Sequence, residues 1–127
     1  MTRFLLVCLG GAVGTGARYA VGGWAASRFG AGFPVGTLAI NAMGSFAISV
    51  VMYLGLTAGA LSADVRVFLA VGVLGGFTTY SSFNYEALAL FQRGAWLMGL
   101  LYMGGTVAVC LAAGVLGLAA ARWTWGG

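Results

Sequence analysis

Four long apolar stretches restrict this chain to very few folds. They cover about residues 4–26, 33–60, 64–91 and 95–121. A transmembrane helix needs about 20 mostly apolar residues to cross roughly 30 Å of hydrocarbon, and each stretch reaches that length. Only short connections remain between them. The sequence therefore predicts an all-α membrane protein in which residues 1–127 form a single four-helix transmembrane domain.

The composition excludes most soluble and catalytic roles. Hydrophobic residues make up 61% of the chain and charged residues 6%, too few for the polar surface of a soluble domain. There is no lysine or histidine, and the only carboxylates are Asp64 and Glu86. Acid–base catalysis and most metal sites need those groups, so we expect no enzyme. Cys8 and Cys110 lie in separate apolar runs and are interpreted as buried side chains rather than redox or metal-binding groups.

The arginines carry information about orientation in the membrane. They are spread singly, which fits anchors in the headgroup region and not a nucleic-acid surface. In a four-helix topology one side holds Arg3, Arg66 and Arg122, and the other holds Arg18, Arg28 and Arg93. Cytoplasmic loops normally carry an excess of positive charge, so this balance favours neither orientation. Four helices are also few for enclosing a pore. The sequence therefore predicts an antiparallel, dual-topology homodimer.

Two further features of the first and second stretches bear on how these helices insert and pack. Arg3 followed by a short apolar run resembles a signal peptide, but the stretch resumes after Arg18 and reaches spanning length. Glycines four residues apart, Gly10 with Gly14 and Gly55 with Gly59, predict close approach of helix backbones.

Polar residues recur every fourth position on two predicted helices. The second helix carries Thr37, Asn41, Ser45 and Ser49, and the fourth carries Tyr102, Thr106 and Cys110. Polar groups at membrane depth need partners, so they face protein or water. For any single Ser or Thr we favour hydrogen bonds between helices, or from the hydroxyl back to its own helix. For Asn41 we favour a role in lining an internal passage.

The third stretch contains a segment that makes poor helix, GGFTTYSSFN at residues 75–84. Adjacent glycines and β-branched or hydroxyl residues all lower helix propensity. We therefore expect this helix to be broken mid-membrane, with freed carbonyls satisfied by protein, water or a cation. Tyr80 and Phe83 lie three residues apart, and the electropositive edges of their rings suit a small anion. Ordinary packing of both rings is the alternative.

Three motifs, in order, make the chain resemble the Fluc (CrcB) fluoride channel family. They are GGAVG at 10–14 with ARY at 17–19, FPVGTL at 33–38 with Asn41 and Gly44, and GGFTTYSSF at 75–83. Together they extend over the chain in the family's order. The resemblance implies a fluoride-selective channel in the bacterial inner membrane, which exports fluoride passively and lowers its toxicity. It also implies an antiparallel dimer with two pores, one central structural sodium and no organic cofactor.

The resemblance further implies roles for individual residues. Asn41 is a pore-lining donor, and Tyr80 and Phe83 occupy the family's aromatic box. Arg18 lies in an aqueous vestibule, and the backbone carbonyls of Gly75 and Thr78 coordinate sodium. The remaining expected pore residues are Thr37, Thr79, Ser81, Ser82, Tyr102 and Thr106. Two positions depart from the family pattern, because Tyr80 replaces the usual Phe and Cys110 replaces a frequent hydroxyl.

Two other classes of membrane protein share features of this sequence. A small proton-coupled exporter also has four helices and dual topology, but it needs a membrane-embedded carboxylate, for which Glu86 is the sole candidate. A structural or accessory protein needs the small and polar residues for packing alone. Passage of fluoride through the purified protein separates a channel from both.

Overall fold

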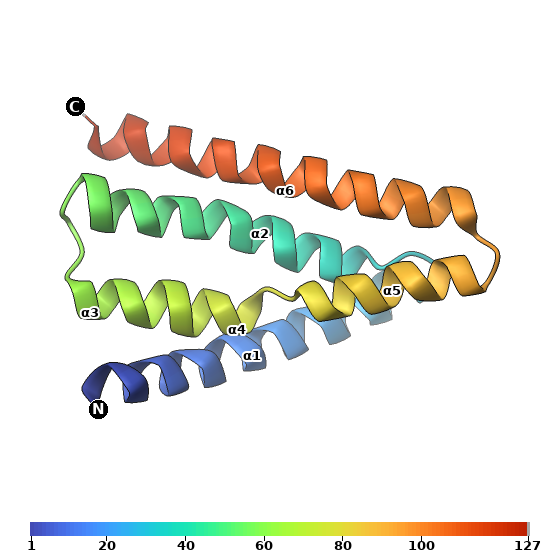
Figure 1. Ribbon diagram of the computed structural model, residues 1–127, viewed down its shortest axis with the longest axis horizontal. Helices are drawn as coiled ribbons and strands as arrows, with labels where there is room; N and C mark the ends of the chain where they lie inside the picture. Colours follow the sequence, from blue (N-terminus) through green and yellow to red (C-terminus); the bar gives the residue numbers. More distant parts are fainter. Residues whose placement is uncertain (127) are drawn as a thin grey trace.

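The computed structural model describes residues 1–126, and they form a helical bundle (Figure 1). Four helical spans are long and apolar enough to cross a membrane: Thr2–Phe29, Val35–Thr57, Ala63–Gln92 and Trp96–Trp125. The expectation of an all-helical protein with four spanning helices is therefore confirmed. The first span includes Arg18 without a break, so its two apolar halves form one helix.

The spans are divided into eight helical elements. The first span is α1 (Thr2–Phe29), and the second comprises α2 (Val35–Met52) and the π-helix η1 (Tyr53–Thr57). The third comprises α3 (Ala63–Arg66), the π-helix η2 (Val67–Leu74), α4 (Gly75–Phe77) and α5 (Tyr80–Gln92). The fourth is α6 (Trp96–Trp125).

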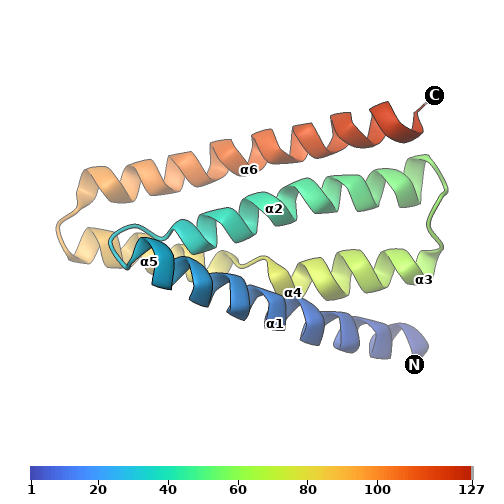
Figure 2. The same cartoon turned by 180° about the vertical axis from the view of Figure 1, so that it is seen from behind.

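The second span occupies the middle of the bundle. In Figures 1 and 2, α2 lies between α6 and the third span, and α1 crosses the third span obliquely. Its most extensive contacts are with α6, while α1 packs chiefly against η2. The N-terminus, the end of α6 and the α2–α3 connection lie at one end of the bundle. The other two connections lie at the opposite end.

Local sequence signals explain where several helices begin and end. Ser62 caps α3 by accepting a hydrogen bond from the Val65 N–H at 3.3 Å. Gly30 and Gly94, which follow α1 and α5, both have φ of 75°, a conformation that glycine adopts without steric cost. Pro34 directly precedes α2, where its missing N–H breaks no helical bond.

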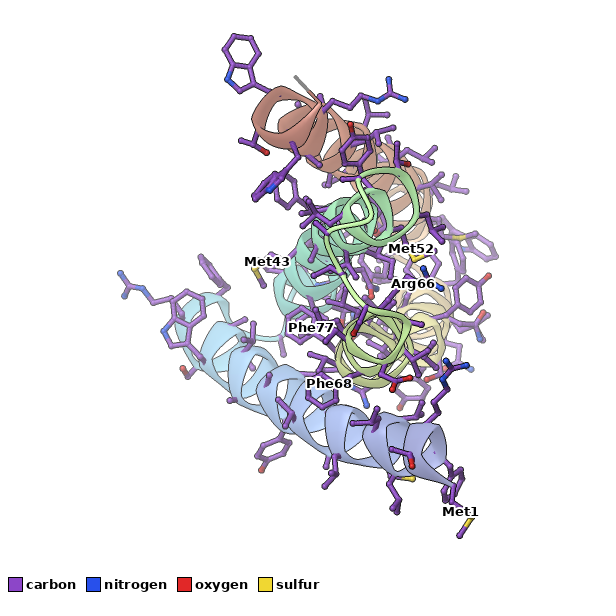
Figure 3. All side chains as sticks on the ribbon, turned by 90° about the vertical axis from the view of Figure 1, so that its left-hand side faces the viewer. Met1, Met43, Met52, Arg66, Phe68 and Phe77 are labelled. Atoms are coloured by element: carbon purple, nitrogen blue, oxygen red, sulfur yellow. The ribbon has the colours of Figure 1, made fainter. Side chains whose placement is uncertain are left out.

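The two π-helical segments are not indicated by the sequence pattern. A π-helix has wider turns than an α-helix and is rare outside functional or strained regions. At η1, Arg66 donates a hydrogen bond from Nη1 to the Gly55 carbonyl at 3.3 Å. Figure 3 shows Arg66 at the end of the bundle that holds the connection between the second and third spans. A Cβ on Gly55 would lie 2.7 Å from the Arg66 Cδ atom, so the glycine makes room for this side chain.

Glycines hold α1 unusually close to the third span. A Cβ on Gly10 would lie 2.7 Å from the Phe68 carbonyl oxygen, and one on Gly14 would overlap the Val73 carbonyl oxygen. The predicted close approach at Gly10 and Gly14 is confirmed. The same prediction is wrong for Gly59, which lies in a turn with φ of 64° and has open space around it.

This contact predicts a sharp difference between two glycines of α1. Gly14→Ala should destabilise the protein by about 1–3 kcal/mol, because the neighbouring obstacle is backbone and cannot move aside cheaply. Gly16→Ala is the matched control, since nothing lies within 4 Å of the added methyl group. It should be neutral or slightly stabilising through better helix propensity. Thermal unfolding in detergent measures both; equal melting temperatures would contradict the assigned contact.

Candidate functional site

The helical backbone of the third span is interrupted at Thr78 and Thr79. Helix α4 ends at Phe77 and α5 begins at Tyr80, and both threonines between them are extended, with ψ of 156° and 112°. The interruption is visible between α4 and α5 in Figures 1 and 2. Gly75 and Gly76, at the start of the predicted weak segment 75–84, remain helical. The β-branched threonines leave the helix because their extended backbone is held from outside.

Asn41 on α2 provides that support. Its Nδ2 donates to the Thr79 carbonyl at 3.0 Å, and its Oδ1 accepts from the Thr79 N–H at 2.8 Å. The side-chain amide thus satisfies both polar groups of one extended residue, as a neighbouring β-strand would. Backbone groups within hydrocarbon need such partners, because no water is available to them. One N–H of the Asn41 amide remains for another acceptor.

Side chains at the interruption bond two backbone N–H groups that would otherwise donate within the helix. In a continuous α-helix the Thr79 N–H would bond the Gly75 carbonyl, and the Ser82 N–H would bond the Thr78 carbonyl. Here the Thr79 N–H bonds Asn41, and the Ser82 N–H bonds Thr79 Oγ1 at 3.2 Å. Gly75 and Thr78 therefore lose the usual partners of their carbonyl oxygens. Both residues line an open-sided hollow between α2, the third span and α6, which we call the central hollow.

Thr79 also organises the start of α5. It is the N-cap of this helix, and its hydroxyl donates to Ser82 Oγ at 3.0 Å. The Ser81 Oγ lies 3.4 Å from the same hydroxyl oxygen. Thr79 is buried, Ser82 is half-buried and Ser81 is exposed. The three predicted hydroxyl residues thus form one cluster at the interruption.

The central hollow has a volume of about 420 Å³ and is mainly apolar. It lies between α2, the third span and α6, and its predicted site residues are Asn41, Gly75, Thr78, Thr79, Tyr80, Phe83 and Thr106. The hydroxyl of Thr106 is buried and has no hydrogen-bond partner in the described part of the chain. An unpaired hydroxyl beside an apolar hollow is costly unless something else binds it. Thr106 therefore has an unused hydroxyl donor beside the hollow, although the oxygen itself is buried.

Aromatic rings form a row beside this hollow. The rings of Tyr80 and Phe83 have centroids 5.6 Å apart, and those of Phe83 and Tyr102 are 5.2 Å apart. Phe33 extends the row, with its centroid 5.4 Å from that of Tyr102. Phe83 is only 8% exposed, whereas Tyr80 is 79% exposed on the open side of the hollow. Within one chain, of the two predicted box positions, Phe83 is therefore buried and Tyr80 is exposed.

Glu86, predicted only as the possible carboxylate of a rival exporter, contacts two of the predicted pore residues. One of its carboxylate oxygens accepts a hydrogen bond from Thr37 Oγ1 at 2.7 Å, and the other accepts from the Tyr102 hydroxyl at 2.7 Å. The cluster joins the second, third and fourth spans. A signal was present, because Glu86 follows Phe83 by three residues and so shares its helix face. Its hydroxyl partners belong to the two polar rows predicted on the second and fourth helices, Thr37 to the first row and Tyr102 to the other.

Arg18 lies on the other side of α5. It lines a hollow of about 270 Å³ between α1, α2 and the start of α5, together with Thr15, Thr37, Thr79 and Ser82. Thr37 thus borders both this hollow and the Glu86 cluster. The predicted vestibule arginine is therefore placed next to the hydroxyls at the interruption.

The serines of α2 adopt the alternative interpretation left open by the sequence. Ser45 donates to the Asn41 carbonyl at 2.7 Å, and Ser49 donates to the Ser45 carbonyl at 3.1 Å. Their hydroxyl protons are thus engaged by their own helix, although Ser45 also lines the central hollow. Cys110 lines it as well. Residues 1–126 contain no group of three His, Cys, Asp or Glu placed to hold a metal.

Comparisons with known proteins identify the family of this chain. A family profile described as "CrcB-like protein, Camphor Resistance (CrcB)" matches residues 5–118. The chain belongs to the CrcB family. It is 51% identical to "Fluoride-specific ion channel FluC" of Anaeromyxobacter dehalogenans over 126 residues, which are 99% of this chain and all of the relative. It is 53% identical to a protein of the same name from Thermus thermophilus, over 91% of this chain and 90% of the relative.

Family membership fixes the broad class of this CrcB protein. Its relatives are named as ion channels and not as enzymes, in line with a composition poor in catalytic groups. Together with four helices able to cross a membrane, this makes it a multi-pass membrane protein. The resemblance first seen in three motifs is confirmed, because the profile match spans all of them.

The Asn41 contact predicts a loss of stability on a subtle substitution. Asn41→Asp keeps an acceptor for the Thr79 N–H but places a second oxygen against the Thr79 carbonyl. We expect a loss of about 1–3 kcal/mol, because a buried carbonyl is left without a donor. Ser49→Ala is the control on the same helix, since Ser49 bonds only its own helix; it should change stability by less than about 1 kcal/mol. Thermal unfolding in detergent compares the two, and an unaffected Asn41→Asp protein would contradict the bridging role.

Proposed function

We propose that this protein is a fluoride-selective channel that lets fluoride leave a bacterial cell passively through the inner membrane, which lowers fluoride toxicity in the cytoplasm. The observation that carries the proposal is the central hollow, where the unpartnered Thr106 hydroxyl lies among apolar and aromatic side chains. The choice of fluoride as the ion rests on the relatives, which are named as fluoride-specific ion channels.

The chemistry of fluoride suits this set of groups. A selective pore must replace the water around a small, strongly hydrated anion with fixed donors, yet bind it weakly enough for release. The spare N–H of Asn41 and the hydroxyl of Thr106 are such donors, and the ring edges of Tyr80 and Phe83 add weak positive potential. Next along the path, Thr37 and Tyr102 present hydroxyls that now bond Glu86. Thr79, Ser81 and Ser82 complete the polar lining beside the interruption, and Arg18 attracts anions to the vestibule.

A second, antiparallel copy would complete the site. The central hollow is open on one side, and Tyr80 at its rim is 79% exposed. Arg3, Arg66 and Arg122 belong to one end of the bundle, and Arg28 and Arg93 to the other, with Arg18 on the same half. This balance lets copies insert both ways. Two oppositely oriented copies would then enclose two equivalent pores, with the interruption of the third span mid-membrane.

The interruption also suits a structural sodium ion. The carbonyl oxygens of Gly75 and Thr78 have lost their helical donors and are hard oxygen ligands, of the kind that unwound membrane helices present to sodium. One chain offers two such oxygens. The antiparallel partner would offer two more around the dimer axis. A sodium ion there would add fixed positive charge near the fluoride path.

Passive export needs no energy source of its own. A membrane that is negative inside drives an anion outward by about 2.3 kcal/mol per 100 mV. The rival class, a proton-coupled exporter, has one observation in its favour, the membrane-embedded carboxylate of Glu86. Glu86→Gln separates them, because a proton-coupled exporter would lose transport without its carboxylate, whereas intact fluoride transport would remove this rival.

Fluoride efflux from proteoliposomes tests the channel proposal directly. With a fluoride-selective electrode, the unmodified protein should release fluoride at once on addition of a potassium ionophore, and should release no chloride. Phe83→Ile and Asn41→Asp should each slow fluoride efflux by at least about tenfold, a barrier increase of about 1.4 kcal/mol. Phe4→Ile is the matched control, because Phe4 is exposed on α1 away from the hollow. Full efflux in both site variants would refute the assigned path.

Sodium withdrawal tests the proposed cation. Protein purified with N-methylglucamine in place of sodium should unfold at a lower temperature, because a ligand that binds only the folded state stabilises it. Returning sodium should restore the melting temperature. Thr78→Ser should keep this response, since the proposed ligand is the carbonyl. Melting curves that do not depend on sodium would argue against the site.

A further inference from the structure

A separate hollow lies at the end of the bundle that holds the α1–α2 connection. It has a volume of about 430 Å³ and lies between the last turns of α1, the start of α2 and the last turns of α5. Its lining includes Thr37 and Glu86 on the inner side, and Arg93 directly after α5. Most of its other lining is small or apolar, such as Gly22 and Ala25.

The Glu86 cluster lies between this hollow and the central one. Thr37 and Glu86 line the end hollow, and Glu86 accepts the hydrogen bond from Tyr102. The ring of Tyr102 lies 5.2 Å from that of Phe83, which lines the central hollow. The hydrogen-bonded side chains of Thr37, Glu86 and Tyr102 thus lie between the two hollows, and we call them the neck.

The charges around the neck pose a problem for an anion. A carboxylate at a narrow point repels fluoride, and in surroundings of low dielectric constant that repulsion is strong. The Thr37 and Tyr102 hydroxyls offset part of the charge of Glu86 by donating to it. Arg93 is the only full positive charge among the residues that line the end hollow. Its Nε donates to the Ala89 carbonyl at 3.3 Å, which holds the side chain along the end of α5.

We propose that the end hollow is the second mouth of the fluoride path, and that Arg93 is the cation that concentrates fluoride there against the repulsion of Glu86. This inference rests on the proposed channel function and adds a residue to it. Arg18 lines a different hollow, on the α1 side of the interruption. A charge at a mouth raises the local concentration of the opposite ion, and so it acts on entry more than on passage through the neck.

Arg28 provides a matched control for Arg93. Both arginines lie near the same end of the bundle, so both contribute to the general positive field there. Arg28 belongs to the last turn of α1 and is exposed, but it is not among the residues that line the end hollow. If Arg93 acts at the mouth, removing its charge should slow fluoride entry and removing the charge of Arg28 should not. If only the general positive field matters, removing either charge should slow entry. In an antiparallel dimer both faces of the membrane would present such a mouth, so the direction of insertion does not matter.

The test is the initial rate of fluoride efflux at limiting fluoride, compared between low and high ionic strength. At about 10 mM salt, where screening extends over roughly 30 Å, Arg93→Gln and Arg93→Met should each lower the rate about 3- to 10-fold. Near 1 M salt the difference from the unmodified protein should close. At saturating fluoride the maximal rate should be nearly unchanged. Arg93→Lys should keep most of the low-salt rate, and Arg28→Gln should match the unmodified protein.

Melting temperatures recorded alongside show whether each variant folds, and two neutral variants of different chemistry guard against a failure of one. The inference is overturned if both neutral variants keep the full low-salt rate, or if Arg28→Gln slows efflux as much as they do. It is also overturned if the loss persists unchanged at high salt, since that would indicate a structural role. Failure of the channel proposal itself looks different, because the unmodified protein would then release no fluoride at any ionic strength.

Discussion

The two hydrogen bonds between the Asn41 side chain and the Thr79 peptide are the interaction on which the rest of the site depends. In hydrocarbon, an extended residue inside a helix exposes an N–H and a carbonyl that find no water, at a cost of several kcal/mol. Asn41 satisfies both at 2.8 and 3.0 Å. With Thr79 held extended, its hydroxyl is free to cap α5, and the direction of α5 brings Phe83 to the central hollow.

Close packing keeps this interruption in one place. Gly44 on α2 leaves room for the methyl group of Thr78, and a Cβ at that position would overlap it. On the opposite side, Gly10 and Gly14 let α1 approach η2 until backbone meets backbone. Thr15 adds a long hydrogen bond of 3.5 Å to the Gly76 carbonyl. In lipid such contacts matter because helix association gains little from the hydrophobic effect and relies on close packing and polar bonds.

The site combines an apolar space with few, well-placed polar groups. In the central hollow the Thr106 hydroxyl lacks a partner among the described residues, while the serines of α2 are engaged by their own helix. Beyond Phe83 the surroundings change, because Glu86 gathers hydroxyls from two other spans. A proposed path for an anion therefore passes from weak, neutral donors to a carboxylate and then to Arg93. That order of groups balances attraction against release, which is the general requirement for conduction.

The sequence by itself determined the four spanning helices, the family and most of the polar positions, because length, hydropathy and residue spacing act locally along the chain. It also located the weak segment of the third span at residues 75–84, but it did not say which residues of that segment leave the helix. The interruption falls at the threonines because Asn41, 38 residues earlier in the chain, bonds Thr79. Glu86 binds Thr37 and Tyr102 because the second and fourth spans bring these hydroxyls to it. Gly59 makes no close helix contact because no other element lies beside it. Such contacts depend on how the spans pack, and the pattern within a single helix does not contain that information.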